Sequence, residues 1–357
     1  MEYQNILIIK MSSVGDIIHA LPFAAALRER YPRAHISWLV HPQFAGFIPE
    51  APMIDEVLYF DKEAFKQMSW GKKLAFIRDF RRTLHAKNFD LVIDLQGLFK
   101  SGAVALLTGC PHKIGYWEMR EGSSLISTPI KGAHAHDHVI ERYLDVARYL
   151  GAEVKKITFP LPKFVAESAK IKEMLLAAGL GETPTGAVQP YIVLAPGARW
   201  ETKQWPKENF AKLALLLIKE GFPVVLIGGK ADIPLGQAIT AMVNNTQSLI
   251  NLVGKTNLSE LAALLKDAYF YISADTGPLH IANAYGKPLI AIYGPTRPNR
   301  TGPYGNPLAT VLQAKVPCVG CLKKHCDDWQ CMHTITPGQV LVVFKQKMGV
   351  IHLGVRE

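Results

Sequence analysis

The stretch that decides the fold is residues 6–30, ILIIKMSSVGDIIHALPFAAALRER. Its first four residues are aliphatic, which is typical of a buried strand. A short polar loop, residues 10–16, follows. Residues 17–30 then have the composition of a helix, and Pro22 lies about one turn inside it, where a missing N–H does least harm. A strand that leads through a loop into a helix is the first half of a βαβ unit.

The same alternation of short aliphatic and longer amphipathic segments continues along the chain. It predicts an α/β fold, with parallel sheets between layers of helices. Further strands are expected at residues 36–40, 57–60, 91–94, 192–195, 224–227, 270–273 and 289–293. Helices are expected at residues 70–87, 139–150, 172–178, 207–220, 258–266, 279–285 and 338–350. This order gives two doubly wound halves, and such sheets bind ligands outside the carboxyl ends of their strands.

The length of the chain also indicates two domains. Its 357 residues suffice for two cores but hardly for three. Residues 179–190 are rich in Gly, Pro and Thr and form the predicted linker. We therefore expect Rossmann-like domains at residues 1–178 and 191–337. A C-terminal helix within 338–357 could pack back on the first domain.

The composition is that of an ordinary folded protein. Apolar residues make up 49% and charged residues 20%, which excludes a mainly disordered, collagenous or fibrous chain. The longest apolar runs, such as residues 6–9 and 103–107, are far shorter than the ~20 residues of a membrane helix. The first ten residues have no pattern of a secretory signal. A cytoplasmic location is the expectation.

The net charge favours an anionic partner. Lys and Arg number 40 against 30 Asp and Glu, which gives +10. Nucleic acid, anionic lipid and phosphorylated substrates all fit such a balance. The basic residues are scattered over the chain rather than gathered in one tract, and no aromatic-basic RNA-binding signature accompanies them. Nucleic acid is therefore the least expected partner.

The first candidate loop is KMSSVGD, residues 10–16, at the carboxyl end of the first predicted strand. It opens onto a helix, whose free N–H groups and positive dipole end can bind an anion or present a catalytic side chain. A purely structural interpretation makes Asp16 a helix N-cap and Ser12 or Ser13 turn residues.

The second candidate loop is APGARWETKQWP, residues 195–206. Arg199 offers a planar fork of donors and Lys203 a point charge, and together they suit a diphosphate. Both could instead be solvated cations that pack on Trp200 or Trp205.

The third candidate loop is SADTGPLH, residues 273–280, and GPTRP at 294–298 follows the next strand. Pro278 suits the start of a helix, where the amides near Gly277 would face an anion. His280, beside Asp275, is either a ligand contact or a satisfied core histidine. Neither the Walker spacing nor a first-turn Gly-x-Gly-x-x-Gly is present, which argues against P-loop hydrolases and NAD dehydrogenases.

Four of the five cysteines lie within fourteen residues: Cys318, Cys321, Cys326 and Cys331. Such bunching indicates metal ligation or redox chemistry rather than a disulfide framework. A closed structural zinc site, a loop of free thiols and an Fe–S cluster are the three interpretations. The run HAHDH, residues 134–138, has a metal-like composition, but a histidine-rich loop is the favoured interpretation.

Four motifs, taken in order, resemble glycosyltransferase family 9, the ADP-heptose:lipopolysaccharide heptosyltransferases. They are KMSSVGDIIHALP (10–22), DLQGLFKS (94–101), DTGPLH (275–280) and YGPTR (293–297). The resemblance spans nearly the whole chain. Arg120-Glu121 and HVIER (138–142) further resemble the heptosyltransferase I branch, which adds the first heptose to the Kdo of the lipid A core.

The resemblance implies a GT-B fold, with the acceptor mainly on the N-terminal domain and the nucleotide sugar mainly on the C-terminal one. It implies an inverting transfer that needs no divalent metal. Asp16 matches the general base, and Lys203 matches the cation that neutralises the ADP leaving group. With the loop chemistry above, the expected donor-binding residues are Arg199, Thr202, Asp232, Thr256, Asp275, Thr276, Gly277 and His280. The expected acceptor-binding residues are Ser12, Ser13, Gly15, Lys100, Arg120 and Arg142.

The expected partners are ADP-heptose, a Kdo-lipid A acceptor and, peripherally, the cytoplasmic face of the inner membrane. One alternative keeps the family but changes the sugar or the acceptor, as in addition of a second heptose. Another is a GT-B protein that isomerises or hydrolyses a nucleotide sugar, which would need further acid/base carboxylates. A third, of a different class, is a basic zinc-stabilised module that binds nucleic acid or anionic lipid.

Overall fold

A computed structural model describes residues 2–244 and 247–354, with the side chains from residue 350 onward left out. The chain divides into two compact units, Met1–Pro162 and Lys163–Glu357. Each unit is built on one six-stranded sheet. Among the described helices, none combines the length and apolar content needed to cross a bilayer.

The first unit alternates strands and helices. Its strands are β1 (Asn5–Ile9), β2 (His35–Val40), β3 (Glu56–Tyr59), β4 (Leu91–Asp94), β5 (Lys113–Tyr116) and β6 (Thr128–Ile130). Its α-helices are α1 (Val14–Arg30), α2 (Lys62–Gln67), α3 (Trp70–Ala86), α4 (Phe99–Leu107) and α5 (Val139–Tyr149). The strands are parallel in the order β3-β2-β1-β4-β5-β6. The order reverses between β1 and β4, where doubly wound sheets bind their ligands.

The second unit repeats this plan. Its strands are β7 (Ile192–Ala195), β8 (Val224–Leu226), β9 (Leu249–Asn251), β10 (Phe270–Ala274), β11 (Leu289–Tyr293) and β12 (Ala309–Gln313). Its α-helices are α6 (Val165–Ala177), α7 (Lys207–Lys219), α8 (Ile233–Val243), α9 (Leu258–Asp267), α10 (Gly277–Ala284), α11 (Pro298–Thr301), α12 (Gln330–His333) and α13 (Pro337–Gly354). The parallel sheet has the order β12-β11-β10-β7-β8-β9, so its switch point lies between β7 and β10.

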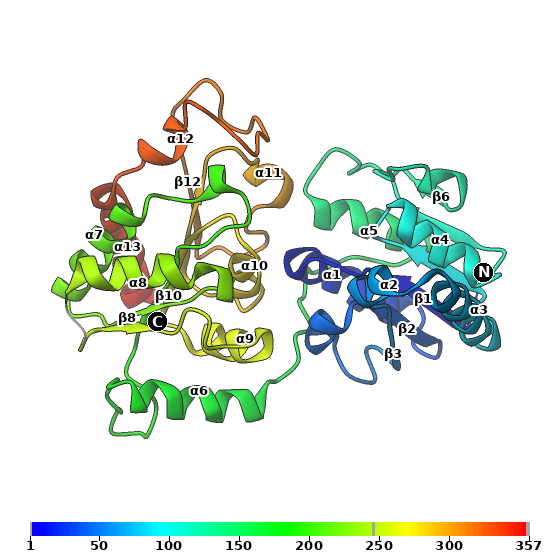
Figure 1. Ribbon diagram of the computed structural model, residues 1–357, viewed down its shortest axis with the longest axis horizontal. Coiled ribbons are helices and arrows are strands. Elements are labelled where there is room, and N and C mark those ends of the chain that lie inside the picture. The colour runs from blue at the N-terminus through cyan, green and yellow to red at the C-terminus, as the bar shows by residue number, and fades with distance from the viewer. Residues whose placement is uncertain (1, 245–246, 355–357) are drawn as a thin grey trace. The chain divides into compact units, whose positions relative to one another are not determined.

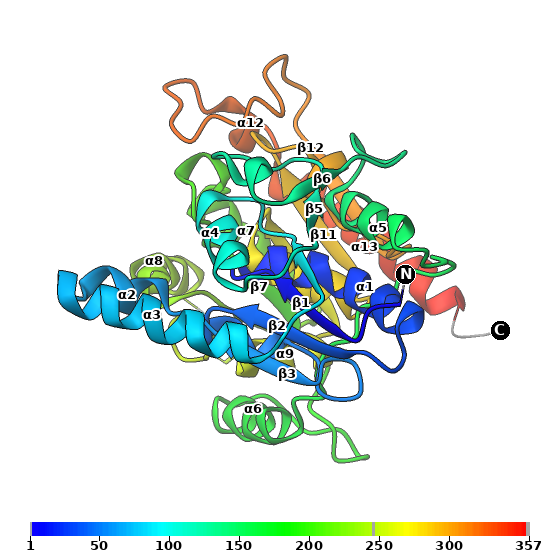
Figure 2. The same ribbon diagram turned by 90° about the vertical axis from the view of Figure 1, so that its right-hand side faces the viewer.

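Helices cover both faces of each sheet. In the first unit α1 packs against α5 on one face, and α3 lies with α4 on the other (Figure 2). In the second unit α7, α8 and α13 pack together, while α9 and α10 cover the opposite face (Figure 1). The central strands β1, β4, β7, β10 and β11 are almost entirely buried. Their continuous aliphatic runs are therefore those of parallel strands covered on both sides.

The predicted strands coincide with strands of the structure, whereas four short strands escaped prediction. β6, β9 and β12 lie at sheet edges, and β5 lies next to one. Polar residues, Gly or Pro interrupt each of them, so they lack the continuous aliphatic run that reveals the predicted strands. Helices α2, α4, α8, α11 and α12 also escaped prediction.

The division between the units falls elsewhere than the predicted linker at residues 179–190. Helix α6 packs against α9, where Ile171 and Leu175 are buried. The ammonium of Lys170 also pairs with Glu260 at 2.5 Å. These contacts make α6 part of the second unit. The C-terminal helix α13 packs on α7 and β11 of the same unit, and its docking on the first unit stays a prediction.

Candidate active site

Asp16 lies at the start of α1, directly after β1. Ser13 is the N-cap of this helix and Asp16 is its third residue, which corrects the interpretation of Asp16 as the cap itself. The backbone N–H and the hydroxyl of Ser13 donate to Oδ2 of Asp16, at 2.8 and 3.0 Å. The Asp16 side chain is still 44% exposed. The carboxylate is therefore both fixed in position and accessible.

A buried lysine lies next to this carboxylate. Nζ of Lys10 donates to the carbonyl of Leu95 at 2.9 Å and to the hydroxyl of Tyr143 at 2.7 Å. It lies 3.9 Å from Oδ1 of Asp16. Burial raises the pKa of Tyr143 well above its ordinary value, so the phenol stays neutral. The loop after β1, the end of β4 and helix α5 together hold a positive charge beside Asp16.

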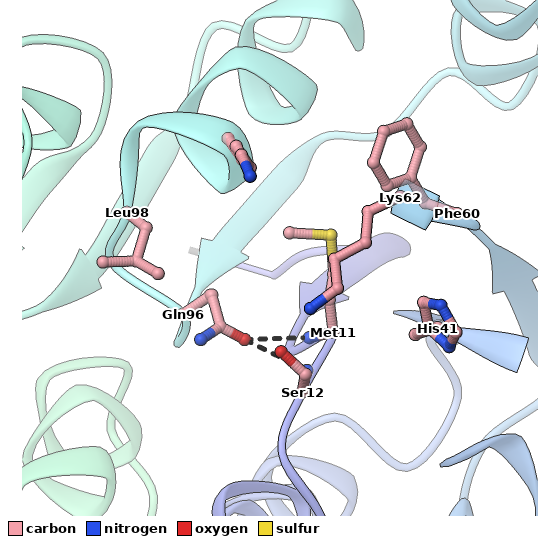
Figure 3. A pocket seen from close by; sticks show the side chains of 8 residues that line it. Met11, Ser12, His41, Phe60, Lys62, Gln96 and Leu98 are labelled. Carbon is pink, nitrogen blue, oxygen red and sulfur yellow. Dashed lines mark hydrogen bonds between the residues drawn. The ribbon is translucent and has the colours of Figure 1, made fainter. Parts of the chain in front are cut away.

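A cavity of about 110 Å³ opens where β1 to β4 end (Figure 3). The segments that follow all four strands line it with Met11, Ser12, His41, Phe60, Lys62, Gln96, Leu98 and Lys100. Oε1 of Gln96 accepts from the backbone N–H groups of Met11 and Ser12, at 3.1 and 3.2 Å. Figure 3 shows Lys62 reaching toward Ser12 and Gln96. Two lysines in the lining favour a ligand that carries an anionic group.

Asp94 organises the loop after β4. Its carboxylate accepts from the N–H groups of Gln96 and Gly97, both at 2.9 Å, and from the hydroxyl of Ser101 at 2.8 Å. Burial raises the pKa of this carboxyl. Gly97 has a φ of +64°, and a Cβ there would lie 2.7 Å from the ring of Tyr116. Only glycine therefore fits this turn.

The two arginines predicted for the acceptor differ in their surroundings. Arg120 is exposed, and its backbone N–H donates to the carbonyl of Gly97 at 2.8 Å. Arg142 is buried, pairs with Glu118 at 3.0 Å and donates to the carbonyl of Asp137 at 2.8 Å. Arg142 is thus committed to contacts within the protein, which makes it a positioning residue in this arrangement.

In the second unit, Lys203 and Asp275 meet between the loops after β7 and β10. Nζ of Lys203 lies 2.7 Å from Oδ2 of Asp275 and 4.6 Å from the centre of the Trp200 ring. The hydroxyl of Tyr293 donates to Oδ1 of Asp275 at 3.3 Å, and Nε2 of His280 lies 3.7 Å from that oxygen. Three groups thus converge on one buried carboxylate.

The electrostatics of this cluster keep Asp275 ionised. Burial by itself would raise the pKa of Asp275, but the charges of Lys203 and His280 outweigh burial and lower it. Burial and the charge of Asp275 raise the pKa of Tyr293 well above its ordinary value. The cluster therefore consists of an anionic carboxylate, a neutral phenol and the ammonium that the carboxylate orients.

Helix α10 begins directly after this carboxylate. Thr276 is its N-cap and makes no side-chain cap bond, Gly277 is its first residue, and a proline lies in its first turn. The open amides and the positive end of the helix dipole can receive an anion there. Thr276 and Gly277 directly follow Asp275, the carboxylate that pairs with Lys203. Their contact with a diphosphate stays a prediction.

The remaining donor candidates are spread over neighbouring loops. Asp232 accepts from the N–H of Gly229 and lies against Gly197, where a Cβ would come within 2.4 Å of its carboxyl carbon. Thr256 is half-buried and precedes the N-cap of α9, and Arg199 is exposed. Thr202 is buried and donates to the carbonyl of Lys323 at 2.8 Å. Thr202 therefore anchors the loop that carries Cys318, Cys321 and Cys326, rather than facing a ligand.

Cys318, Cys321 and Cys326 are exposed, Cys331 is buried, and all four are free thiols. Burial raises the pKa of Cys331, and the other three thiols raise it further. In residues 2–244 and 247–349, no three His, Cys, Asp or Glu side chains are grouped so that they could hold a metal ion. A structural zinc site at the four thiols therefore stays a prediction. His134 pairs instead with Asp137 at 2.7 Å.

Comparison with known proteins decides the family. The model of "Glycosyltransferase family 9 (heptosyltransferase)" matches residues 77–331. The chain belongs to glycosyltransferase family 9. Lipopolysaccharide heptosyltransferase 1 of Pseudomonas aeruginosa is 30% identical over 90% of this chain and 87% of its own length. Lipopolysaccharide heptosyltransferase 2 of Escherichia coli is also 30% identical, over 84% of this chain and 85% of its own length.

Solved structures agree with this family 9 assignment. Heptosyltransferase WaaC of Escherichia coli with ADP-2-deoxy-2-fluoro heptose is 25% identical and has a TM-score of 0.73. The match covers 96% of this chain and 99% of that one. The expected GT-B fold of two Rossmann-like units is confirmed, and the chain is a glycosyltransferase. Because the chain is a glycosyltransferase, the alternative interpretation of it as a nucleic-acid binding module has no support.

Several site residues of this glycosyltransferase could not be singled out from the sequence. The sequence places Lys10 only in a loop, because nothing local reveals that its ammonium is buried against Tyr143. His41, Phe60 and Lys62 follow β2 and β3, and only the strand order brings them beside Ser12. A signal did exist, since His41 and Lys62 follow the predicted strands 36–40 and 57–60, and Phe60 ends the second of these strands. Gly15 is buried within α1, and its contact with an acceptor stays a prediction.

Proposed function

We propose that this chain transfers a heptose from ADP-heptose to the Kdo of the lipopolysaccharide inner core, as the first heptose addition. Family membership and the names of the relatives support the donor and the core acceptor. Relatives of both types match equally well, so the first-heptose assignment rests on Arg120-Glu121 and residues 138–142. The observation that carries the proposal is the anchored, accessible carboxylate of Asp16 in the unit that also holds the lysine-lined cavity.

Asp16 acts as the general base in this proposal. It accepts the proton of a Kdo hydroxyl while that oxygen attacks the anomeric carbon of the heptose. The bond between this carbon and the diphosphate oxygen breaks, its electron pair leaves with ADP, and the configuration inverts. The bonds from Ser13 fix Asp16 in one orientation, and such positioned proton transfer contributes about 10²- to 10⁴-fold to a rate.

Lys203 stabilises the leaving diphosphate. An ammonium has three donors, and Asp275 uses one of them, so two remain for phosphate oxygens. Asp275 is itself an anion and would repel a phosphate, so we assign it the orientation of Lys203. The open amides at the start of α10 supply further donors. One well-placed donor of this kind is worth about 3 kcal/mol in a transition state.

The lysine-lined cavity receives the anionic part of the acceptor. A Kdo unit carries a carboxylate, and Lys62 and Lys100 offer it two ammonium groups from the first turns of α2 and α4. Binding this carboxylate would direct the attacking hydroxyl, which is the specificity that a transferase needs. We further propose that the reaction needs no divalent metal and occurs at the cytoplasmic face of the inner membrane.

The test compares wild type, Asp16→Asn and the control Glu208→Gln, which alters an exposed first-turn carboxylate of α7. Each protein receives ADP-heptose and Kdo2-lipid A in detergent with a chelator, and ADP release and product mass are measured. We expect a product one heptose heavier from wild type and control. Asp16→Asn should lose at least about 10²-fold in kcat while its affinity for ADP-heptose stays unchanged.

Two results would contradict parts of this proposal. Transfer only to an acceptor that already carries one heptose would assign the second addition instead. Normal turnover by Asp16→Asn together with weak donor binding would remove Asp16 from the role of base.

A further inference from the structure

Helix α3 in the first unit carries an apolar stripe that the protein does not cover. Trp70 is 78% exposed and Leu74 62%, and Ile77 is also exposed. Their spacing of four and three residues places them on one face of the helix. Phe76 and Phe80 lie on a different, inward face of the helix, where both pack against Phe60. The exposed stripe is therefore not needed to hold α3 in place.

Cations flank this stripe. Helix α3 contains five Lys and Arg and a single acid, Asp79, so it carries four of the ten net positive charges of the chain. At 100° per residue Arg81 continues the stripe, and Arg78 and Arg82 lie beside it. Among the described residues Lys72, Lys73 and Arg81 form no ion pair with an acid, although Asp79 pairs with Arg78 and Arg82.

An exposed tryptophan with two aliphatic residues beside a row of arginines matches the chemistry of a bilayer surface. The apolar side chains would enter the boundary between headgroups and acyl chains, while the guanidinium groups bind lipid phosphates. We propose that the surface formed by Trp70, Leu74, Ile77, Arg78, Arg81 and Arg82 docks this unit on an anionic lipid bilayer. The proposal rests on the proposed function, because that acceptor is itself anchored in lipid.

The position of α3 in the first unit also supports an anionic bilayer as its partner. Helix α2 connects to α3 and begins at Lys62, which lines the cavity after β3. Helix α4 contacts α3, and its second residue is Lys100, the other lysine of that cavity. Both neighbours of the docking helix thus contribute to the cavity that we assign to the anionic part of the acceptor. Docking through α3 would keep this cavity near the headgroups from which the acceptor projects.

The test measures flotation with vesicles of phosphatidylethanolamine and phosphatidylglycerol, and with vesicles of phosphatidylcholine alone. The apolar variant combines Trp70→Ser, Leu74→Ser and Ile77→Ser. The basic variant combines Arg78→Gln, Arg81→Gln and Arg82→Gln. The matched control combines Leu215→Ser, Met242→Ser and Val342→Ser, which remove exposed apolar groups from α7, α8 and α13 of the second unit.

We expect wild type and control to bind the phosphatidylglycerol vesicles and to lose this binding at high salt. The apolar variant and the basic variant should each bind at least about tenfold more weakly. Transfer to a detergent-dispersed acceptor should be equal in all four proteins, which shows that the variants fold. With the acceptor embedded in vesicles, the KM of both variants should rise.

Binding of the apolar variant equal to that of wild type would overturn the docking surface. Equal binding of wild type to phosphatidylcholine would also overturn it. A wild-type dimer that the apolar substitutions convert to monomers, measured by light scattering, would assign the stripe to a second copy of the chain instead. Failure of all four proteins to transfer heptose would contradict the proposed function alone, because vesicle binding is read separately.

Discussion

Asp275 shows how one buried carboxylate can set the position of a functional cation. It accepts from Lys203 at 2.7 Å and from Tyr293 at 3.3 Å. The substitution Asp275→Asn keeps the shape but removes the charge. We expect it to lower the free energy of unfolding at pH 7 by about 1–3 kcal/mol, and to lower turnover because Lys203 loses its orientation.

The pH dependence of this loss follows from the lowered pKa of Asp275. A carboxyl whose pKa is lowered by folding stabilises the protein above its unfolded value, here 3.8, and the stabilisation disappears as the pH falls through the folded value. The gap between wild type and Asp275→Asn in urea unfolding should therefore narrow below pH 3.8. A gap that stays constant down to the acid transition would show that charge is not its origin.

At the scale of elements, the loop between β4 and α4 depends on Asp94. Its three donors can all be satisfied by an asparagine, because the new amide can donate to Ser101 while the hydroxyl of Ser101 donates to the carbonyl of Leu98 at 2.8 Å. We expect Asp94→Asn to change the free energy of unfolding at pH 7 by less than about 1 kcal/mol, and Asp94→Ala to cost about 2–3 kcal/mol. Urea unfolding measures both.

The raised pKa of Asp94 predicts how the stability difference between wild type and Asp94→Asn changes with pH. Because folding raises this pKa above 3.8, the ionised form is the less favourable one in the folded state. Wild type should lose stability relative to Asp94→Asn as the pH rises from 3.8 through the folded value. The opposite trend would mean that the three hydrogen bonds outweigh burial.

The two sites also show which features the sequence can predict and which it cannot. The strands β1, β4, β7 and β10 were predicted because a buried parallel strand is a continuous aliphatic run. The loops after them were predicted because ligands bind at such ends. The lining residues His41 and Lys62 required the strand order, and the burial of Lys10 required the contact with Tyr143. Pairings across 19 to 133 positions leave no local pattern.

At the scale of the whole molecule, one topology occurs twice with different chemistry. Both sheets reverse their order between the first and fourth strands of their unit. In the first unit this point presents a carboxylate, Asp16, and in the second it presents an ammonium, Lys203. The shared fold thus supplies two equivalent places for ligands, and the side chains after the strands decide what each place can do.

The division at Pro162 and Lys163 can be tested with fragments. We expect residues 163–357 to fold alone and residues 179–357, which lack α6, to be less stable. The shorter fragment exposes the surface that Ile171 and Leu175 cover, and each fully buried aliphatic side chain is worth about 1.5–3 kcal/mol. Urea unfolding should therefore separate the fragments by about 3–6 kcal/mol. Lys170→Ala in the longer fragment is the control and should cost less than about 1 kcal/mol, because that lysine is largely exposed. Equal stability of the two fragments would return the boundary to residues 179–190.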